Sequence, residues 1–358
     1  MANSSGRAPS DLEAIQALLE RLNLRPEQLL SKRATPTMPT FAEYVDRVSA
    51  AVPASTLRVY GTYWRKLKAA WGHRTIDEPS PTEVKQFVLD IKGQVVVRRN
   101  ARGGRTAMEH MVAAFRCLYS FAIEDGYIVM GDNPAATVEK PRRLPSNRYA
   151  LTPVQLGEIN RTAAHSGDDP HLDSLLLRLH EETACRRGGA LALRPVDLNR
   201  QLCLIRLREK GETERDQPVS PTLMAALLRH VEQRGDGDEQ GQVLRTRKGT
   251  PITRRRYDYL WSRLGKEVPW VRALGVSSHW LRTTTLTWVE RNFGYAVARA
   301  YAGHNDRRSN AGTTTTYVRA DIYEVAAALS AITKERHPLL EANAPDPWLW
   351  RSSRPETT

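Results

Sequence analysis

A proline- and arginine-rich stretch divides this chain into two parts with different hydrophobic patterns, and this division constrains the fold most. The stretch is Lys140-Pro-Arg-Arg-Leu-Pro145, whose prolines are unsuited to the interior of a helix or a central strand. From about residue 39 to 138, apolar residues recur at helical spacing without strand-like alternation. After the stretch, helical segments are interrupted by one alternating segment. We therefore expect a mainly α protein with a small β component, in which a helical domain precedes a mixed α/β domain.

The expected elements follow from periodicity and from Gly and Pro signals. The helices are expected at 41–50, 55–71, 82–92, 104–125, 153–163, 171–183, 221–233, 253–265, 280–292, 295–301 and 321–334. Residues 202–208 lead into the turn-prone segment 209–213 and a return towards Pro218-Val219, which predicts a β-hairpin. Five regions result: an N-terminal helical extension at 1–38, the helical domain at 39–138, a linker at 139–149, the mixed domain at 150–340 and a C-terminal tail at 341–358.

Positive charge is in excess in both of these domains. Among the 358 residues, 53 are Lys or Arg and 40 are Asp or Glu, which gives a formal charge of +13. The segment 92–105 contains no acidic residue, and the segment 245–272 has nine basic residues against two acidic ones. A basic surface attracts polyanions, and DNA is the commonest because neutralised phosphates release counterions. These two separated basic segments favour two surfaces that bind one polyanion.

Several classes of protein are excluded. No apolar run approaches 18 residues, and the N-terminal residues lack a basic region followed by an apolar core, so neither a membrane span nor a secretory signal is expected. The three cysteines, Cys117, Cys185 and Cys203, have no CxxC spacing, which argues against a disulfide scaffold and a cysteine-rich zinc site. A reducing cytoplasm fits this composition best.

Four polar signals in the mixed domain need a common explanation. They are Arg186 at a helix end, Lys210 at the hairpin tip, His279 with Arg282, and Gly303-His304 followed by Tyr317. Each is weak alone, because arginines are usually solvated and single histidines are usually structural.

Two sequence boxes join these signals. The first box runs from Thr183-Ala-Cys-Arg-Arg-Gly-Gly to Val196-Asp-Leu-Asn199, and the second contains His279-Trp-Leu-Arg282, Ala302-Gly-His304 and Thr314-Thr-Thr-Tyr317. In this order they resemble the tyrosine recombinase (phage integrase) family, over about residues 40–335. The resemblance implies a SAM-like helical core-binding domain and a tyrosine-recombinase catalytic domain.

The resemblance also implies a reaction. Arg186 and Arg282 would clamp the nonbridging oxygens of the scissile phosphate, where bidentate guanidinium donors stabilise growing negative charge. Tyr317 would attack phosphorus and leave a 3′-phosphotyrosine with a free 5′-hydroxyl. The protein would thus be a site-specific DNA recombinase that serves integration, excision or transposition of a mobile element.

Proton transfer in that reaction would fall to three other residues. Lys210 matches the general acid that protonates the departing 5′ oxygen, although Lys248 is an alternative in a nearby turn. His279 and His304 match positions that donate to the phosphate and manage the proton of the tyrosine. Neither a metal nor another cofactor is expected, because the arginines and the lysine supply the positive charge.

The chain departs from the family pattern at several places, which include Trp280 and Thr283 beside Arg282. Gly189 stands where the family usually has an acidic residue supporting the first arginine. The interval from His304 to Tyr317 is longer than usual, which leaves open whether the tyrosine acts in its own site or in a neighbour's. Tyr301 and Tyr323 are competing nucleophiles.

The expected partners are double-stranded DNA with specific recombination sites and a homo-oligomer, most simply a tetramer on two sites. The family's two domains form a C-shaped clamp, and the protein would be cytoplasmic and nucleoid-associated. The basic residues expected to contact DNA are Lys92, Arg98, Arg99, Arg102, Arg105, Arg142, Arg143, Arg254, Arg255 and Arg256. Two other functions stay open: DNA relaxation like that of a type IB topoisomerase, and catalytically silent binding of DNA, which Gly189 favours.

Overall fold

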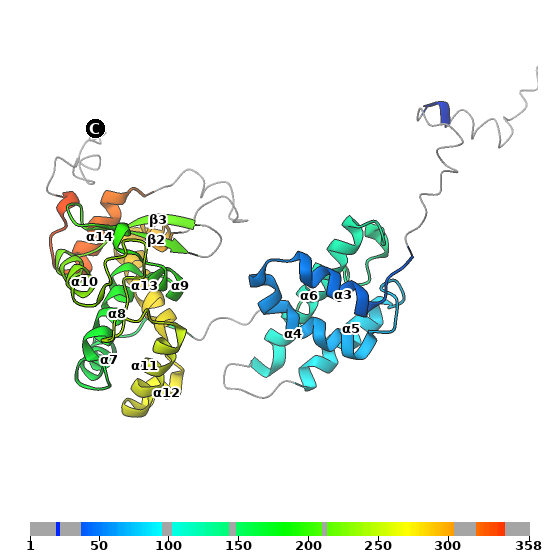
Figure 1. The fold of residues 1–358 in the computed structure, drawn as a ribbon, viewed down its shortest axis with the longest axis horizontal. Helices are drawn as coiled ribbons and strands as arrows, with labels where there is room; N and C mark the ends of the chain where they lie inside the picture. Colours follow the sequence, from blue (N-terminus) through cyan, green and yellow to red (C-terminus); the bar gives the residue numbers. More distant parts are fainter. Residues whose placement is uncertain are drawn as a thin grey trace, which may run out of the picture. The chain divides into compact units, whose positions relative to one another are not determined.

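The computed structural model describes residues 19–21, 37–94, 102–142, 148–209, 213–303 and 320–340. The chain divides into two compact units, Met1–Pro145 and Ser146–Thr358 (Figure 1). Within the described ranges the protein is mostly helical and has one three-stranded sheet, which confirms the expected fold class. No helix in these ranges is long and apolar enough to cross a bilayer. The predicted tail at 341–358, and all but residues 19–21 of the predicted N-terminal helix, lie outside the description.

The first unit is built from helices that wrap an aromatic core. Its described helices are α3 (Phe41–Ala51), α4 (Ala54–Trp71), α5 (Pro81–Gly93) and α6 (Arg105–Glu124), with short 3-10 turns at Arg102–Gly104 and Met130–Asp132. Trp64 is fully buried and its Nε1 donates to the Ala114 carbonyl at 3.0 Å. Arg116 in α6 donates to the carbonyl oxygen of Val138 at 3.0 Å and so holds the exit segment against the unit. The four predicted helices are confirmed, with ends that differ by one residue.

Capping residues explain where two of these helices begin. The side chains of Thr40 and Ser80 each accept a hydrogen bond from the backbone amide of a glutamate three residues later. The carboxylate of that glutamate in turn accepts a hydrogen bond from the backbone amide of Thr40 or Ser80. Such a capping box satisfies amide groups that the first turn of a helix leaves without partners.

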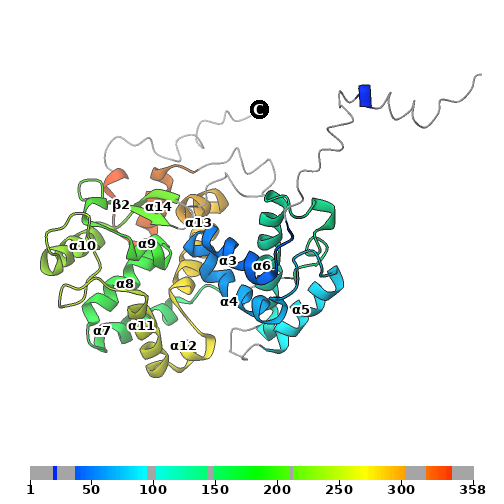
Figure 2. The same cartoon turned by 45° about the vertical axis from the view of Figure 1, so that its right-hand side comes forward.

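The second unit packs helices around a small antiparallel sheet. Its elements are α7 (Pro153–His165), α8 (Pro170–Thr183), α9 (Arg187–Leu191), β1 (Leu198–Asn199), β2 (Leu204–Glu209), β3 (Thr213–Pro218), α10 (Pro221–Arg234), α11 (Arg254–Glu267), α12 (Pro269–Leu274), α13 (Ser278–Ala302) and α14 (Ile322–Thr333). The strands lie in the order β1-β2-β3, so the predicted hairpin is confirmed. Helix α8 contacts α7, α10 and α13 and forms the centre of the unit. Helix α14 packs against β3, and Figure 1 labels these two elements near each other, while Figure 2 labels α14 beside the neighbouring strand β2.

Three short elements and one helix boundary differ from the sequence prediction. Helices α9 and α12 and strand β1 have two to six residues, too few for a period to be visible. The predicted helices at 280–292 and 295–301 are the two arms of α13, which meet at a kink at Gly294. Gly294 has a φ of 87°, a conformation that glycine adopts without steric cost.

Candidate active site

Arg186 lies where the chain turns from α8 into α9. Helix α8 ends at Thr183, and Ala184 takes a left-handed conformation with a φ of 49°, in which its amide donates to the His180 carbonyl at 3.0 Å. This conformation is uncommon for a residue with a Cβ. The tight turn makes Arg186 the N-cap of α9, with its side chain 38% exposed.

The carboxylate of Glu209 holds Arg186 in place. Glu209 is the last residue of β2, and its side chain is 1% exposed. One carboxylate oxygen accepts the Arg186 amide at 2.6 Å, and the other pairs with the Arg186 guanidinium. A charge-assisted pair of this kind fixes the orientation of the arginine, so one edge of the guanidinium is anchored inside the protein while the side chain stays partly exposed.

Arg282 lies in α13 and is 4% exposed. Its guanidinium donates to the Ala184 carbonyl and, at 2.7 Å, to the Ala302 carbonyl. It therefore joins the turn before Arg186 to the last residue of α13. Burial, and next the positive charge of Arg186, lower the pKa of Arg282 to about 10. The group stays protonated at neutral pH, and a bound anion would relieve the repulsion between the two arginines.

His279 occupies the first turn of α13, and its residue surface is exposed. Partial desolvation and the charges of Arg148, Arg282 and Arg186 lower its pKa below the usual 6.5. The imidazole is therefore neutral near pH 7, with one nitrogen able to donate and the other able to accept. His279 and Arg282 lie one turn apart on α13, and Arg282 bonds the Ala184 carbonyl in the turn before Arg186, so these three residues are grouped in one candidate site.

The other three predicted catalytic residues, Lys210, His304 and Tyr317, lie outside the described residues. The chain positions immediately before two of them are described. Glu209, which precedes Lys210, bonds Arg186. Gly303, which precedes His304, is the C-cap of α13 with a φ of 66° and directly follows Ala302, whose carbonyl accepts from Arg282.

Arg215 is part of this site although sequence reasoning did not select it. It pairs with Leu207 across the hairpin and donates to the carbonyls of Tyr301 at 2.7 Å and Thr183 at 3.2 Å. Burial lowers its pKa, while Glu209 acts in the opposite direction. Its Nε is buried and finds no acceptor among the described residues. The sequence carries no local signal for Arg215, because its place in the site depends on the register of β2 against β3.

The structure also tests the alternative residues. Tyr301 is fully buried, its hydroxyl donates to the Glu182 carbonyl, and burial raises its pKa. It is therefore unsuited to attack a phosphate in the folded protein. Tyr323 lies half-buried in the first turn of α14, and Lys248 is exposed in a separate turn between Arg245 and Pro251.

The predicted DNA contacts divide into several groups. Lys92, Arg105, Arg142, Arg254 and Arg255 are exposed. Arg98, Arg99 and Arg143 lie outside the described residues, and only the backbone of Arg102 is described. Arg105 begins α6 and donates to the Arg142 carbonyl at 3.4 Å, so these two basic residues of the first unit lie side by side.

The prediction for Arg256 is corrected by the structure. Its side chain is 10% exposed, and it donates to Asp173 at 2.7 Å and to Asp168 at 2.8 Å. Asp173 is fully buried and also pairs with Arg263. Charge counted along the sequence cannot distinguish such internal ion pairs from basic surface, and Arg256 supports the fold of α8 against α11.

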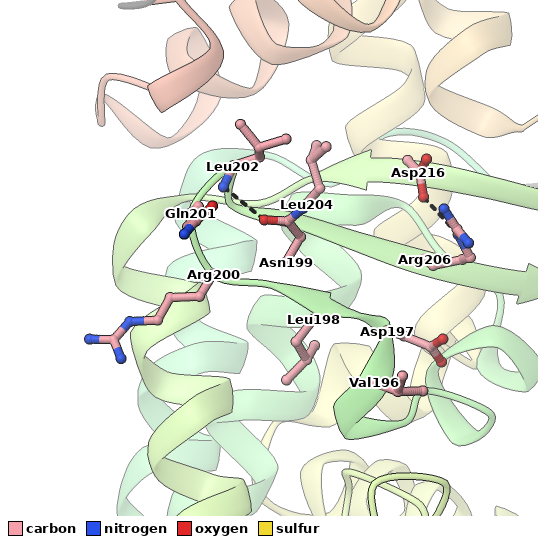
Figure 3. A pocket seen from close by; sticks show the side chains of 10 residues that line it. All are labelled: Val196, Asp197, Leu198, Asn199, Arg200, Gln201, Leu202, Leu204, Arg206 and Asp216. Atoms are coloured by element: carbon pink, nitrogen blue, oxygen red, sulfur yellow. Dashed lines mark hydrogen bonds and ion pairs between the residues drawn. The ribbon is translucent and has the colours of Figure 1, made fainter.

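A separate pocket lies beside the sheet, lined by residues 196–202 with Leu204, Arg206 and Asp216. Figure 3 shows Arg206 and Asp216 paired across β2 and β3, at 3.0 Å. None of the described candidate catalytic residues lines it. The candidate active site is therefore the arginine site around Arg186 and Arg282.

Comparison with curated proteins finds two recombinases. The chain is 27% identical over 219 residues to tyrosine recombinase XerC of Chlamydia pneumoniae, which covers 58% of this chain and 67% of that protein. It is 24% identical over 247 residues to XerC of Chlamydia caviae, which covers 67% of this chain and 73% of that protein. No profile of a known protein family matches the chain.

Solved structures share the fold. A λ integrase tetramer bound to a Holliday junction matches with a TM-score of 0.58 and 14% identity, over 85% of this chain and 90% of that one. The Tn1549 transposon integrase in complex with a circular intermediate DNA matches with a TM-score of 0.59 and 16% identity, over 82% and 99%. The fold is thus that of the DNA integrases. In sequence and in fold, the chain is a relative of the tyrosine recombinase (phage integrase) family.

Proposed function

We propose that this protein is a site-specific DNA recombinase that cuts and rejoins strands through a 3′-phosphotyrosine on Tyr317. One observation carries the proposal: the Arg282 guanidinium donates to the carbonyl of Ala184, two residues before Arg186, so α13 holds Arg282 against the turn that carries Arg186. Two neighbouring guanidinium groups favour the binding of an anion, and a phosphate in the transition state carries more negative charge than in the ground state. The recombinase relatives support the same reaction.

In the proposed reaction a covalent phosphotyrosine replaces the broken phosphodiester bond, so the strand can be rejoined without ATP. The Tyr317 oxygen forms a bond to phosphorus as the bond to the 5′ oxygen breaks, and a 5′-hydroxyl of another strand later reverses the step. Lys210 would give its proton to the departing oxygen. His279, which is neutral at pH 7, would donate to the phosphate, and His304 would take part in moving the proton of Tyr317.

The biological setting belongs to the same proposal. The region 39–138 would bind the core of the recombination site and 150–340 would carry the chemistry, joined by the linker at 139–149. Double-stranded DNA would be bound by a homotetramer on two sites. The reaction would integrate, excise or transpose a mobile element, in the cytoplasm and at the nucleoid.

The test uses covalent trapping on DNA. Full-length protein is incubated with nicked duplexes from a library that includes DNA flanking its gene, and adducts are recovered after denaturation and sequenced. We expect adducts with the wild-type protein and with Tyr323→Phe, and none with Tyr317→Phe. An adduct with Tyr317→Phe would refute the nucleophile assignment. Relaxation of any supercoiled plasmid by a monomer would instead favour a topoisomerase. DNA binding without any adduct would favour a catalytically silent DNA-binding protein.

A further inference from the structure

Gly189 lies three positions after Arg186, and the space beside it is occupied. A Cβ at Gly189 would lie 3.1 Å from Cγ of Glu209 and 3.4 Å from its Oε1. The neighbouring strand thus brings a carboxylate against the helix where a side chain at position 189 would extend. The glycine gives this carboxylate room.

Position 189 also has a defined place in the helix. Arg186 is the N-cap of α9, so Gly189 is the N3 residue. In a capping box, a Glu at N3 accepts a hydrogen bond from the N-cap amide. Here Glu209 accepts that bond from the Arg186 amide at 2.6 Å, and its second oxygen pairs with the Arg186 guanidinium. A strand residue therefore makes the contact that an N3 side chain would make.

The origin of the carboxylate has a consequence for the hairpin. Glu209 is the last residue of β2, directly before Lys210. Its charge also acts on Arg215 and Arg282, whose pKa values it raises against the effect of burial. The buried Glu209 carboxylate thus acts on the arginine site from the end of β2, the strand that leads to Lys210.

We infer that Glu209 is a positioning residue that orients Arg186 and fixes the root of the Lys210 hairpin to it, and that Gly189 is the complementary half of this arrangement. The inference rests on the proposed strand-transfer function. A carboxylate on α9 would orient the arginine alone, whereas the carboxylate on β2 makes the position of the hairpin root depend on the arginine.

Relocating the acid tests this pair. Glu209→Ala is expected to slow cleavage of nicked DNA at saturating protein by about 10- to 100-fold, the usual effect of losing a group that orients a functional residue. Gly189→Glu alone brings a second carboxylate against Glu209 and is expected to slow cleavage as well. The double variant Glu209→Ala with Gly189→Glu restores an N3 carboxylate and is expected to cleave at least about fivefold faster than Glu209→Ala.

A matched control lies on the same hairpin. Glu214 in β3 pairs with Arg208 at 2.9 Å and its side chain is 55% exposed. Glu214→Ala is expected to cleave within about twofold of the wild type, because an exposed ion pair contributes little. DNA affinity is measured for each variant, so that a loss of cleavage is separated from a loss of binding.

A second readout needs no DNA. Exchange of the Arg186 amide hydrogen, followed by NMR, is expected to accelerate in Glu209→Ala and to slow again in the double variant. Unchanged exchange in Glu209→Ala would overturn the inference, as would a double variant that cleaves no faster than Glu209→Ala. If the wild-type protein forms no adduct, the proposed function fails, and amide exchange still decides the inference.

Discussion

At the scale of single residues, the site depends on two arginines in different environments. Arg186 is partly exposed and is held by a carboxylate, whereas Arg282 is buried and is held by two backbone carbonyls. Among the described residues no carboxylate forms an ion pair with Arg282, so its guanidinium adds positive charge to the site. Arg282 is therefore both a structural brace and the source of positive potential.

Substituting Arg282 is expected to affect stability and cleavage together. Arg282→Ala leaves the carbonyls of Ala184 and Ala302 without this donor, which we expect to cost about 2–4 kcal/mol of the free energy of unfolding. Arg282→Lys keeps a charge but loses the fork, and we expect cleavage to fall by about 10²- to 10³-fold. Denaturant unfolding and adduct formation measure the two effects. Arg291→Ala, an exposed position on α13, is the control and is expected to change neither.

A buried histidine gives the protein a pH-dependent stability. Burial, and next Arg234, lower the pKa of His230 to about 4, and its Nε2 accepts the Arg245 amide at 3.2 Å. The unfolded chain binds this proton below about 6.5 and the folded protein does not, so stability falls as the pH drops from 6.5 towards 4. We expect His230 to account for about 3 kcal/mol of that loss. Urea unfolding of His230→Gln should show a flatter dependence; an unchanged slope would contradict this assignment.

At the scale of elements, long segments could be predicted from the sequence and short ones could not. Helices such as α4 and α6 have enough turns for their apolar stripe to be visible, and the alternation in β2 identified the hairpin. Helices α9 and α12 are too short for a period. The same limit applies to the site: Arg186 and Arg282 could be recognised from motifs, but Glu209 and Arg215 act through the pairing of β2 with β3, which no local pattern encodes.

Helix α11 shows why charge in the sequence overestimates the basic surface. Arg254 and Arg255 are exposed, whereas Arg256 on the next position is buried against Asp173. We expect Arg255→Ala to weaken DNA binding and to reduce the slope of log affinity against log salt by about 1. Arg256→Ala is expected to lower the free energy of unfolding by about 1–3 kcal/mol, because it removes one of the two arginines that pair with the buried Asp173 and leaves Arg263.

Salt titrations of DNA binding and denaturant unfolding separate these two arginines. The outcome that would contradict the division is a reduction of the salt slope by about 1 in Arg256→Ala with unchanged stability. A loss of stability in Arg255→Ala equal to that in Arg256→Ala would also contradict the division between a DNA-contacting and a structural arginine.

At the scale of the whole molecule, two units with separate cores carry the two halves of the proposed activity. The first has an aromatic core and an exposed basic pair at Arg105 and Arg142. The second places the arginine site between the hairpin, the turn after α8 and both ends of α13. Each unit has basic surface, and the basic residues that the structure describes include exposed side chains, internal ion pairs and the arginines of the site.

The central claim is that this chain forms a covalent bond to DNA through Tyr317. Trapped adducts are digested with nuclease and protease, and the modified peptide is mapped by mass spectrometry. The account predicts a nucleotide linked through its 3′ phosphate to Tyr317, with a free 5′-hydroxyl on the other DNA end. A nucleotide on Tyr323 or on any other residue, or specific DNA binding that never yields an adduct, would contradict it.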